Sequence, residues 1–249
     1  MSGVGSAEGG FSSAAGTSTR LRPAFARAAI GRLKELVPSG SGAPSTRVLS
    51  IESGSGVLVG QLARAGLNCW ALASQQAVAA ELNRSLPQVR VTSASLTALP
   101  IRSGGIDLLC IGAGLEQALT ESALAEIRRV LRYGATLVQV INLMDGSVDW
   151  VQNLDALTSS ASSSSQWLES PGESAYFAEP TVEFFPNSVP SSVNHELDRL
   201  RADLHAAAIA SELQVAVLAE AKELLTSQAD SSGAIERPQD TALRYWRAV

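Results

Sequence analysis

The stretch that decides the fold is residues 46–62, TRVLSIESGSGVLVGQL. Residues 47–51 form a short apolar run typical of a buried strand, and residues 57–64 have the spacing of a helix. Glycines at 54 and 56 separate the two. Because glycine leaves the backbone uncovered, such a turn brings N–H groups and the positive end of a helix up to a ligand. In doubly wound α/β folds this turn borders the nucleotide crevice, so the stretch predicts a nucleotide-like cofactor at Gly54 and Gly56.

Composition indicates a globular protein with a large core. The chain has 249 residues, of which 45% are hydrophobic, and its mean hydropathy is +0.12. No apolar run reaches the roughly 18 residues that a membrane span needs. The net charge of −5 argues against a broad phosphate-binding surface, so we expect neither nucleic acid nor membrane as a partner. Cys69 and Cys110 fall within predicted strands and are expected to be small buried apolar residues rather than disulfide partners or zinc ligands.

The N-terminal segment, residues 1–20, is rich in glycine, serine and alanine and is predicted to be flexible. Residues 9–34 contain basic side chains but no acid, which is typical of a transit peptide. Glu8 interrupts that pattern, and the basic residues of 21–36 also fit the solvated face of a helix. We therefore expect a cytoplasmic location, with a mitochondrial one as the alternative.

Strands and helices alternate along most of the chain, which predicts a parallel sheet covered on both faces. The second half is less regular, with a serine-rich loop over residues 158–175. Residues 21–249 are expected to form one domain. The expected strands are 47–51, 68–73, 88–93, 106–111, 134–141, 181–185 and 241–249; the expected helices are 23–36, 57–64, 76–86, 121–132 and 149–157, with one long or two shorter helices in 191–227.

Several short motifs occur in a characteristic order. The turn reads VLSIESGSG over residues 48–56, and ALP follows at residues 98–100. IDLL at 106–109, EIRRVLRYGA at 126–135 and an Asn–Asp–Trp segment over 142–150 come next. In this order they resemble the class I S-adenosylmethionine-dependent methyltransferases, specifically the type 11 small-molecule branch. The resemblance implies a doubly wound, Rossmann-like α/β sheet of seven strands, mostly parallel with the last strand antiparallel, and helices on both faces.

The resemblance also implies a site for S-adenosylmethionine at the carboxyl ends of the first four strands, but this chain departs from the family there. The family's motif acid is replaced by Ser50, and its first glycine by Glu52, which has the same strand parity and could supply the missing carboxylate. The acid that accepts hydrogen bonds from the ribose aligns with Ala73. Losing such a bond costs about 1.5–3 kcal/mol, or ten- to a hundred-fold in affinity. Ser74 could recover part of it.

Two further departures lie beyond the second strand. The position for the adenine edge reads Ser95-Leu96, without an acid, and the aromatic stretch that follows the fourth strand in relatives reads GAGL from Gly112. S-adenosylmethionine is therefore the expected cofactor, with binding that is weak or lost. The candidate cofactor-binding residues are Ser50, Glu52, Ser53, Gly54, Ser55, Gly56, Ala73, Ser74, Ser95, Leu96 and Gly112.

These departures leave two functions open. The first is methyl transfer to an unidentified small molecule, which depends on positioning and requires no particular catalytic side chain, so none is assigned. The second is a catalytically inactive pseudo-methyltransferase that serves as a binding or assembly module with a protein partner. A dehydrogenase is a third alternative, but its G-x-G-x-x-G pattern fits only if the spacing is stretched to Gly60.

The remaining polar residues are expected to have structural roles. Asp107 begins a strand far from the crevice, while Asp145 and Trp150 fit loop capping and packing. His195 and His205 lie in a helical region with no partner placed beside them, so a general base there is not favoured. No P-loop, Ser-His-Asp arrangement or metal-ligand pattern occurs in the sequence.

Overall fold

A computed structural model describes residues 23–37, 46–52, 54, 56–112, 119–158, 176–206 and 209–249. The chain divides into two compact units. Of the described residues, those in 23–143, 176–187 and 239–249 belong to the sheet unit, and those in 144–158 and 188–238 belong to the helical unit. The single methyltransferase-like domain expected over 21–249 stays a prediction. The predicted flexible segment 1–20 and, from residue 159 on, the predicted serine-rich loop lie outside the described residues.

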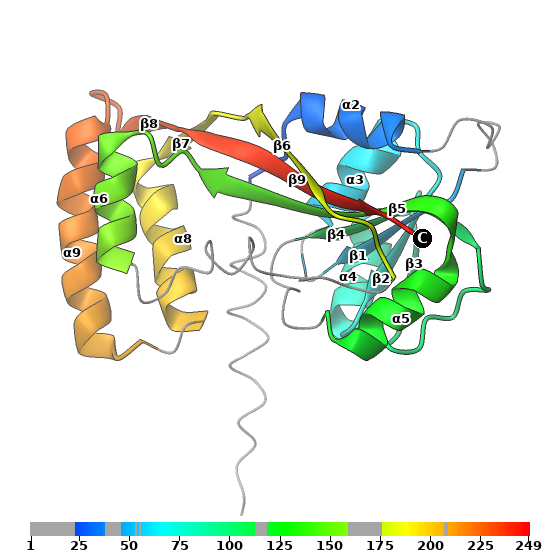
Figure 1. Ribbon diagram of the computed structural model, residues 1–249. Helices are drawn as coiled ribbons and strands as arrows, with labels where there is room; N and C mark the ends of the chain where they lie inside the picture. The colour runs from blue at the N-terminus through cyan, green and yellow to red at the C-terminus, as the bar shows by residue number, and fades with distance from the viewer. Residues whose placement is uncertain are drawn as a thin grey trace, which may run out of the picture. The chain divides into compact units, whose positions relative to one another are not determined.

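The sheet unit is built on a seven-stranded sheet with the strand order β3-β2-β1-β4-β5-β9-β6 (Figure 1). The β1–β2, β1–β4, β2–β3 and β4–β5 pairs are parallel, whereas β6 and β9 pair antiparallel. This arrangement confirms the predicted sheet. The strands are β1 Val48–Glu52, β2 Cys69–Ala73, β3 Arg90–Ser93, β4 Ile106–Gly112, β5 Leu131–Met144, β6 Thr181–Pro186 and β9 Gln239–Arg247.

Helices cover both faces of this sheet. Successive side chains of a strand point to opposite faces, so both faces of the sheet carry apolar residues that need covering. Val48 on β1 packs into a core with α2, α3 and α4, whereas Leu49 packs into a second core with α5. The strands β1, β2 and β4 are buried almost throughout, as expected for parallel strands between two helical layers, whereas β3 at the sheet edge is mostly exposed. The helices are α2 Arg27–Glu35, α3 Val57–Arg64, α4 Gln76–Ser85 and α5 Glu121–Val130.

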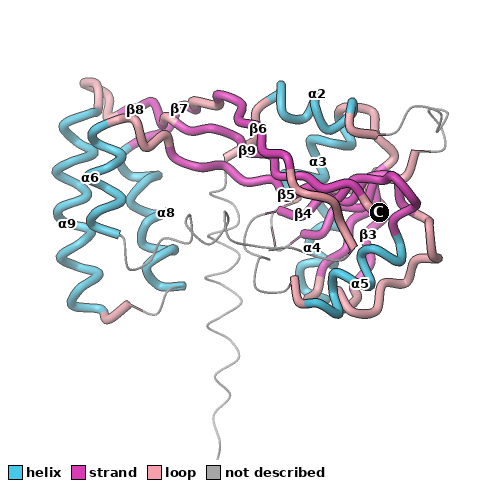
Figure 2. Tube along the Cα trace, viewed as in Figure 1, coloured by secondary structure: helices cyan, strands magenta, loops and turns pink. Residues whose placement is uncertain are grey.

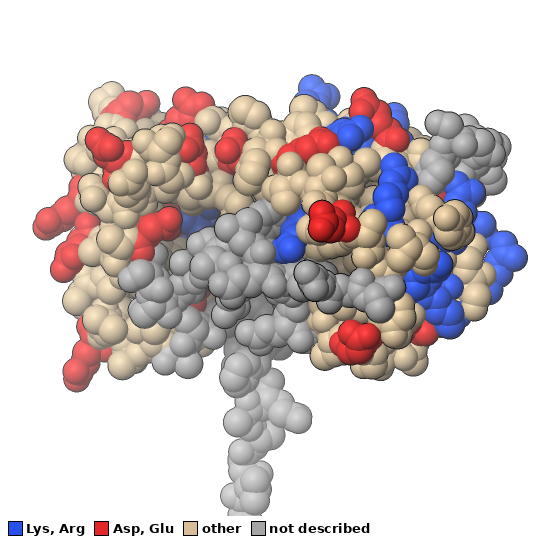
Figure 3. Space-filling view, viewed as in Figure 1, with Lys and Arg blue, Asp and Glu red and all other residues tan. Residues whose placement is uncertain are grey.

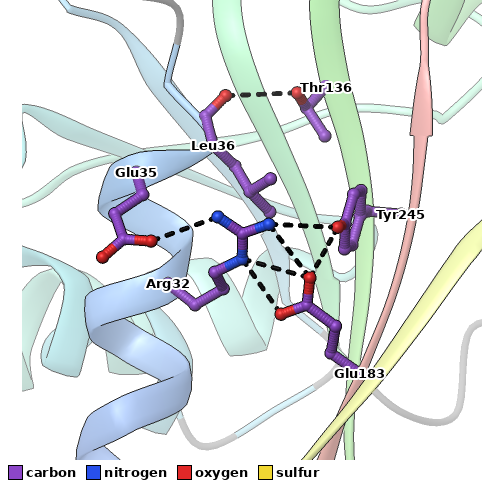
Figure 4. Close-up of polar contacts among 6 residues, drawn as sticks. All are labelled: Arg32, Glu35, Leu36, Thr136, Glu183 and Tyr245. Carbon is purple, nitrogen blue, oxygen red and sulfur yellow. Dashed lines mark hydrogen bonds and ion pairs between the residues drawn. The ribbon is translucent and has the colours of Figure 1, made fainter.

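Helix α2 is tied to the sheet edge by a cluster of three polar side chains (Figure 4). Arg32 on α2 donates from Nε to Glu183 Oε2 of β6 over 2.9 Å. Tyr245 of β9 donates its hydroxyl to Glu183 Oε1 over 2.6 Å and accepts from Arg32 Nη2 over 3.2 Å. The hydrogen bond from Arg32 lowers the pKa of Glu183, with Tyr245 adding to the effect. The cluster therefore joins one helix to two strands through charge-assisted hydrogen bonds.

The described residues of the helical unit form helices and a two-stranded antiparallel sheet (Figure 2). The helices are α6 Asp149–Thr158, α8 Val193–Ala206 and α9 Ser211–Gln228, and the strands β7 Val189–Ser192 and β8 Ala234–Arg237 pair antiparallel. The region predicted as one long or two shorter helices is thus two helices. Trp150, Val151, Leu200 and Leu225 belong to its core.

Acidic residues outnumber basic ones in the described part of the helical unit, and their side chains spread over its visible surface (Figure 3). The basic side chains in the same view gather on the sheet unit near α5. Several arginines of this region bind main-chain carbonyls: Arg128 donates to Val249 O over 2.6 Å, and Arg247 donates to Gly134 O over 3.1 Å. Among the described helices, none has both the length and the apolar character needed to cross a bilayer.

Candidate cofactor site

The turn between β1 and α3 requires a glycine at position 56. Gly56 caps α3 with a left-handed φ of 66°, a conformation that other residues adopt only with strain. A Cβ atom at this position would lie 2.4 Å from Leu82 Cδ2 and 3.0 Å from Leu86 Cδ1. The first turn of α3 therefore approaches α4 closely, and both backbone conformation and packing explain the glycine. Ser53 and Ser55 lie outside the described residues.

The carboxylate of Glu52 folds back over β1 toward the start of α3. Its Oε1 accepts a hydrogen bond from Ser50 Oγ over 2.6 Å and another from Val59 N over 3.1 Å. Both Ser50 and Glu52 are buried. Since Val59 is in the first turn of α3, the carboxylate satisfies a backbone N–H that the helix leaves unpaired, at the positive end of its dipole.

This geometry bears on the motif acid that the chain lacks. Ser50 occupies the acid's position, and Glu52 brings a carboxylate into hydrogen-bond contact with Ser50. Residues 50 and 52 were expected to point to the same face of the sheet, and their side chains do meet on the α3 side. Contact between Glu52 and the ammonium group of a cofactor stays a prediction.

The surroundings of Glu52 are apolar. Cys69 on β2 and Cys110 on β4 are free and buried, as predicted, and belong to the core formed with α2, α3 and α4. Burial raises the pKa of the Cys69 thiol to about 12, and the negative charge of Glu52 adds to the shift. Burial also raises the pKa of Cys110. In this weakly solvated region a charge interacts more strongly with a nearby dipole than it would in water.

The neighbouring strand supplies no acid at the predicted ribose position. Ala73 ends β2, is fully buried and lies opposite Glu52 in the parallel register. Ser74 follows directly and is exposed. The register thus brings residue 73 beside the turn, as the resemblance implies, while the side chain there cannot accept a hydrogen bond.

Three other candidates lie at the ends of β3 and β4. Ser95 is exposed, and its hydroxyl lies 2.9 Å from Thr97 Oγ1 in a local turn. Leu96 is buried in the core beside α5, so packing accounts for it. Gly112, the last residue of β4, is half-buried, and a Cβ atom there would meet nothing within 4 Å. Among the candidates, the parallel register pairs Glu52 with Ala73, and it pairs Ile51 with Ile111, the residue before Gly112.

The residues expected to be structural have structural contacts. Asp107 is buried, pairs with Arg132 over 2.8 Å and accepts from Arg47 N over 2.7 Å. In the helical unit, Asp145 Oδ1 accepts from Ser147 N over 2.9 Å, and Trp150 packs in the core. These contacts confirm the expectation of loop capping and packing.

Both histidines lie on α8 of the helical unit. His195 N donates to Ser192 Oγ over 3.2 Å, and His205 is exposed. Within the described ranges, no group of three or more histidine, cysteine or acidic side chains could hold a metal ion.

Sequence reasoning missed the packing of α4 against the turn. The spacing of Leu82 and Leu86 predicts an apolar helix face, but nothing in the sequence shows that this face meets Gly56. It also missed the buried side chains of Gln139 on β5 and Arg244 on β9, which the strand order brings onto neighbouring strands.

Residues 49–139 match the family described as "Methyltransferase domain". An uncharacterized methyltransferase of Mycobacterium tuberculosis is 29% identical over 144 residues, which is 58% of this chain and 56% of that protein. The chain therefore spans little more than half the length of the curated relatives it matches first. An uncharacterized methyltransferase of Schizosaccharomyces pombe is 33% identical over 76 residues, 30% of each chain.

Solved structures share the fold. A protein from Anaeromyxobacter dehalogenans, assigned by inference as a type II methyltransferase, has a TM-score of 0.58 and 18% identity, covering 91% of this chain and 97% of that one. The YcgJ protein from Bacillus subtilis has a TM-score of 0.51 and 14% identity, covering 90% and 99%. Together with the seven-stranded sheet, these similarities show that the chain has the fold of these proteins, and residues 49–139 match the methyltransferase domain family.

Proposed function

We propose that the protein transfers a methyl group from S-adenosylmethionine to a small molecule. The observation that carries this proposal is the β1–α3 turn, where Gly56 holds the left-handed conformation and Glu52 brings a buried carboxylate to the start of α3. The turn lies beside β4, whose last residue, Gly112, has open space where a side chain would extend. Such a turn suits the close approach of a cofactor to backbone N–H groups.

The residues present fit this cofactor in part. Gly54 and Gly56 leave the backbone of the turn accessible, and the buried charge of Glu52 favours a positively charged group nearby. Ser74 is the hydroxyl next to the ribose position. Bound S-adenosylmethionine would supply an activated methyl group, whose bond to sulfur breaks as its bond to the acceptor forms, leaving S-adenosylhomocysteine. The chain's own part is to align the acceptor and exclude water.

The ribose position fits least well. Ala73 offers no acceptor, and the loss of a charge-assisted hydrogen bond weakens binding about ten- to a hundred-fold. This predicts that Ala73→Asp tightens binding of S-adenosylhomocysteine by about that factor, measured by isothermal titration. Ala71→Asp serves as the matched control, because Ala71 lies two residues earlier on the same face of β2. This substitution would bury a charge away from the glycine turn. Equal affinities for wild type and Ala73→Asp would contradict the assigned ribose contact.

The buried, acceptor-free Ala73 also favours the second candidate, an inactive methyltransferase fold that acts as a binding or assembly module. In that case neither the wild-type protein nor Ala73→Asp binds the cofactor, and transfer of a labelled methyl group to a pool of small molecules is not detected. If Ala73→Asp binds the cofactor and the wild-type protein does not, the absence of an acid at residue 73 accounts for the lost cofactor binding.

A further inference from the structure

Two buried N–H donors without partners lie at the amino end of the sheet, opposite to the candidate cofactor site. Within the part of the chain that the structure describes, Arg47 Nε and Trp70 Nε1 are buried and make no hydrogen bond. Arg47 directly precedes β1, and Trp70 is the second residue of β2. A buried donor without an acceptor is unfavourable, so this pair needs an explanation.

The parallel register brings both residues and a second arginine to one face of the sheet. Trp70 lies opposite Leu49 of β1 on one side and opposite Arg90 of β3 on the other. Leu49 belongs to the core beside α5, and Trp70 packs against that core. Arg47 is two residues before Leu49 and points to the same face, as Arg90 does from its position opposite Trp70. The three side chains therefore share the α5 face across β1, β2 and β3.

The spacing of the strands lets the two arginines reach one ligand. Neighbouring strands lie about 4.8 Å apart and each residue rises about 3.3 Å, so the Cα atoms of Arg47 and Arg90 are about 12 Å apart. Trp70 lies between them on the middle strand. Two long side chains extended toward each other cover that distance, and a group bound between them is within reach of the Trp70 indole N–H.

Neither arginine is neutralised by an acid. Arg47 is half-buried and Arg90 is exposed, and among the described residues neither guanidinium makes an ion pair. The acid on the neighbouring strand β4, Asp107, pairs with Arg132 over 2.8 Å and accepts from Arg47 N over 2.7 Å. Its charge is therefore compensated, and the α5 side of the sheet unit is also where basic side chains gather in Figure 3. The local charge favours an anion.

Donors from three strands suit an anion with three free oxygens. A guanidinium and an indole N–H donate hydrogen bonds and accept none. A phosphate monoester has three strong acceptor oxygens and a charge of about −1.5 to −2 at pH 7, whereas a carboxylate has two oxygens and a single charge. Guanidinium groups bind phosphate through charge-assisted hydrogen bonds. Because no acid holds the Arg47 side chain, it can shift to admit a phosphate oxygen to the indole N–H.

We propose that Arg47, Trp70 and Arg90 form a binding site for the phosphate group of a small phosphate monoester. The two guanidinium groups donate to the phosphate from opposite sides, and Trp70 Nε1 donates to one of its oxygens. The site is separate from the candidate cofactor site, because Arg47 and Glu52 are five residues, or about 16 Å, apart along one extended strand. It uses no residue of the glycine turn and does not depend on the proposed function.

The test follows the indole N–H of Trp70 in the full chain by NMR. Tryptophan labelled with nitrogen-15 gives one indole signal for each of the four tryptophans, and Trp70→Phe identifies the signal of Trp70. The probes are methyl phosphate, which is a monoester, dimethyl phosphate, which is a diester with one charge, and acetate. Titrations are run at constant ionic strength, above the second pKa of the monoester at about 6. We expect methyl phosphate to shift the Trp70 signal saturably and to leave the other indole signals in place.

The affinities separate the proposed contacts. Dimethyl phosphate and acetate should bind at least about tenfold more weakly than methyl phosphate, because each has two free oxygens and one charge. Arg47→Met and Arg90→Met should each weaken methyl phosphate about ten- to a hundred-fold, since each removes a charge-assisted hydrogen bond. Arg64→Met is the matched control and should change nothing, because Arg64 is an exposed arginine of α3, which packs on the opposite face of the sheet.

A Trp70 signal that methyl phosphate does not move would overturn the proposal, as would unchanged affinity in a folded Arg90→Met. Dimethyl phosphate that binds as tightly as methyl phosphate, or more tightly, would also overturn it and would indicate a phosphodiester, such as a nucleic-acid backbone or a phospholipid. If Arg47→Met does not fold, as judged by its thermal unfolding, Arg90→Met still decides, because Arg90 is exposed and its substitution leaves the core intact.

Discussion

At the scale of single residues, Gly56 sets the conformation of the candidate site. Its left-handed φ and the 2.4 Å that would separate an added Cβ from Leu82 Cδ2 both oppose a larger residue. Gly56→Ala is therefore expected to lower the free energy of unfolding by about 1–3 kcal/mol, from backbone strain and overpacking, as measured by urea denaturation.

Gly60 provides the control, because it lies in the same helix with an ordinary conformation and a Cβ position 3.4 Å from Leu86 Cδ2. Gly60→Ala should be neutral or stabilise by up to about 1 kcal/mol, since alanine is the better helix former. Equal destabilisation by both substitutions would mean that crowding by α4, and not the turn, governs position 56.

Near the turn, the sequence predicts which side chains share a face of the sheet, because alternate residues of a strand point the same way. The parity of Ser50 and Glu52 predicts that their side chains share a face, and their hydrogen bond follows from it. The pair of Gln139 and Arg244 was not predictable, because it depends on which strands become neighbours across about a hundred residues of chain. Local pattern does not carry such long-range pairing.

At the scale of elements, the Arg32–Glu183–Tyr245 cluster holds α2 against β6 and β9 (Figure 4). The hydrogen bond from Arg32 lowers the pKa of Glu183. A carboxylate with a lowered folded-state pKa stabilises the fold above its unfolded value, about 4.3, and loses that contribution as pH falls through the folded value. Glu183→Gln should therefore cost about 1 kcal/mol at pH 7 and nothing at low pH, measured by denaturation across that range.

The exposed Arg84–Glu81 pair of α4 supplies the comparison, because it has the same charges without the packing. Arg84→Ala should leave the unfolding transition unchanged at both pH values. A loss of stability for Glu183→Gln that is the same at pH 7 and at low pH would show that packing, not charge, joins α2 to the sheet.

Helices and strands whose apolar residues recur at a regular spacing were predicted from the sequence, and those without such a pattern were not. α3 has the predicted bounds, Val57–Arg64, because a glycine turn and an apolar period define it. The pairing of β7 and β8 was missed, since each strand has four residues and VPSS contains a proline and two serines in place of an alternating pattern. The helices α8 and α9 also separate the two strands along the chain. β5 runs past the predicted end at residue 141 to Met144.

At the scale of the whole molecule, the chain forms two compact units, and a core that includes Trp150, Leu200 and Leu225 belongs to the helical one. The helical unit centres on Glu196, which is 1% exposed and pairs with Arg199 over 3.0 Å. Its Oε1 also accepts from Ser191 Oγ over 2.7 Å. Burial lowers the pKa of the nearby Arg237 to about 10, and the charge of Glu196 acts in the opposite direction.

Removal of Glu196 leaves the buried Arg237 without the carboxylate 3.9 Å from it and leaves Arg199 with Asp203, so Glu196→Ala is expected to destabilise the helical unit by about 3–5 kcal/mol. Hydrogen exchange should show faster exchange in α8 and α9 and unchanged exchange in β1 and β4, because units with separate cores can open separately. Arg201→Ala, which removes an exposed pair with Asp198, should change neither. Equal acceleration in both units would show that they unfold as one.

The measurement that tests the central claim most directly is isothermal titration of the full chain with S-adenosylmethionine and S-adenosylhomocysteine, repeated on Glu52→Ala. The β1–α3 turn, with Gly56 in its left-handed conformation and the carboxylate of Glu52 beside Ser50, predicts micromolar binding that Glu52→Ala weakens. No heat with either ligand at millimolar concentration, from a protein that unfolds cooperatively, would contradict the assignment of this turn as a cofactor site.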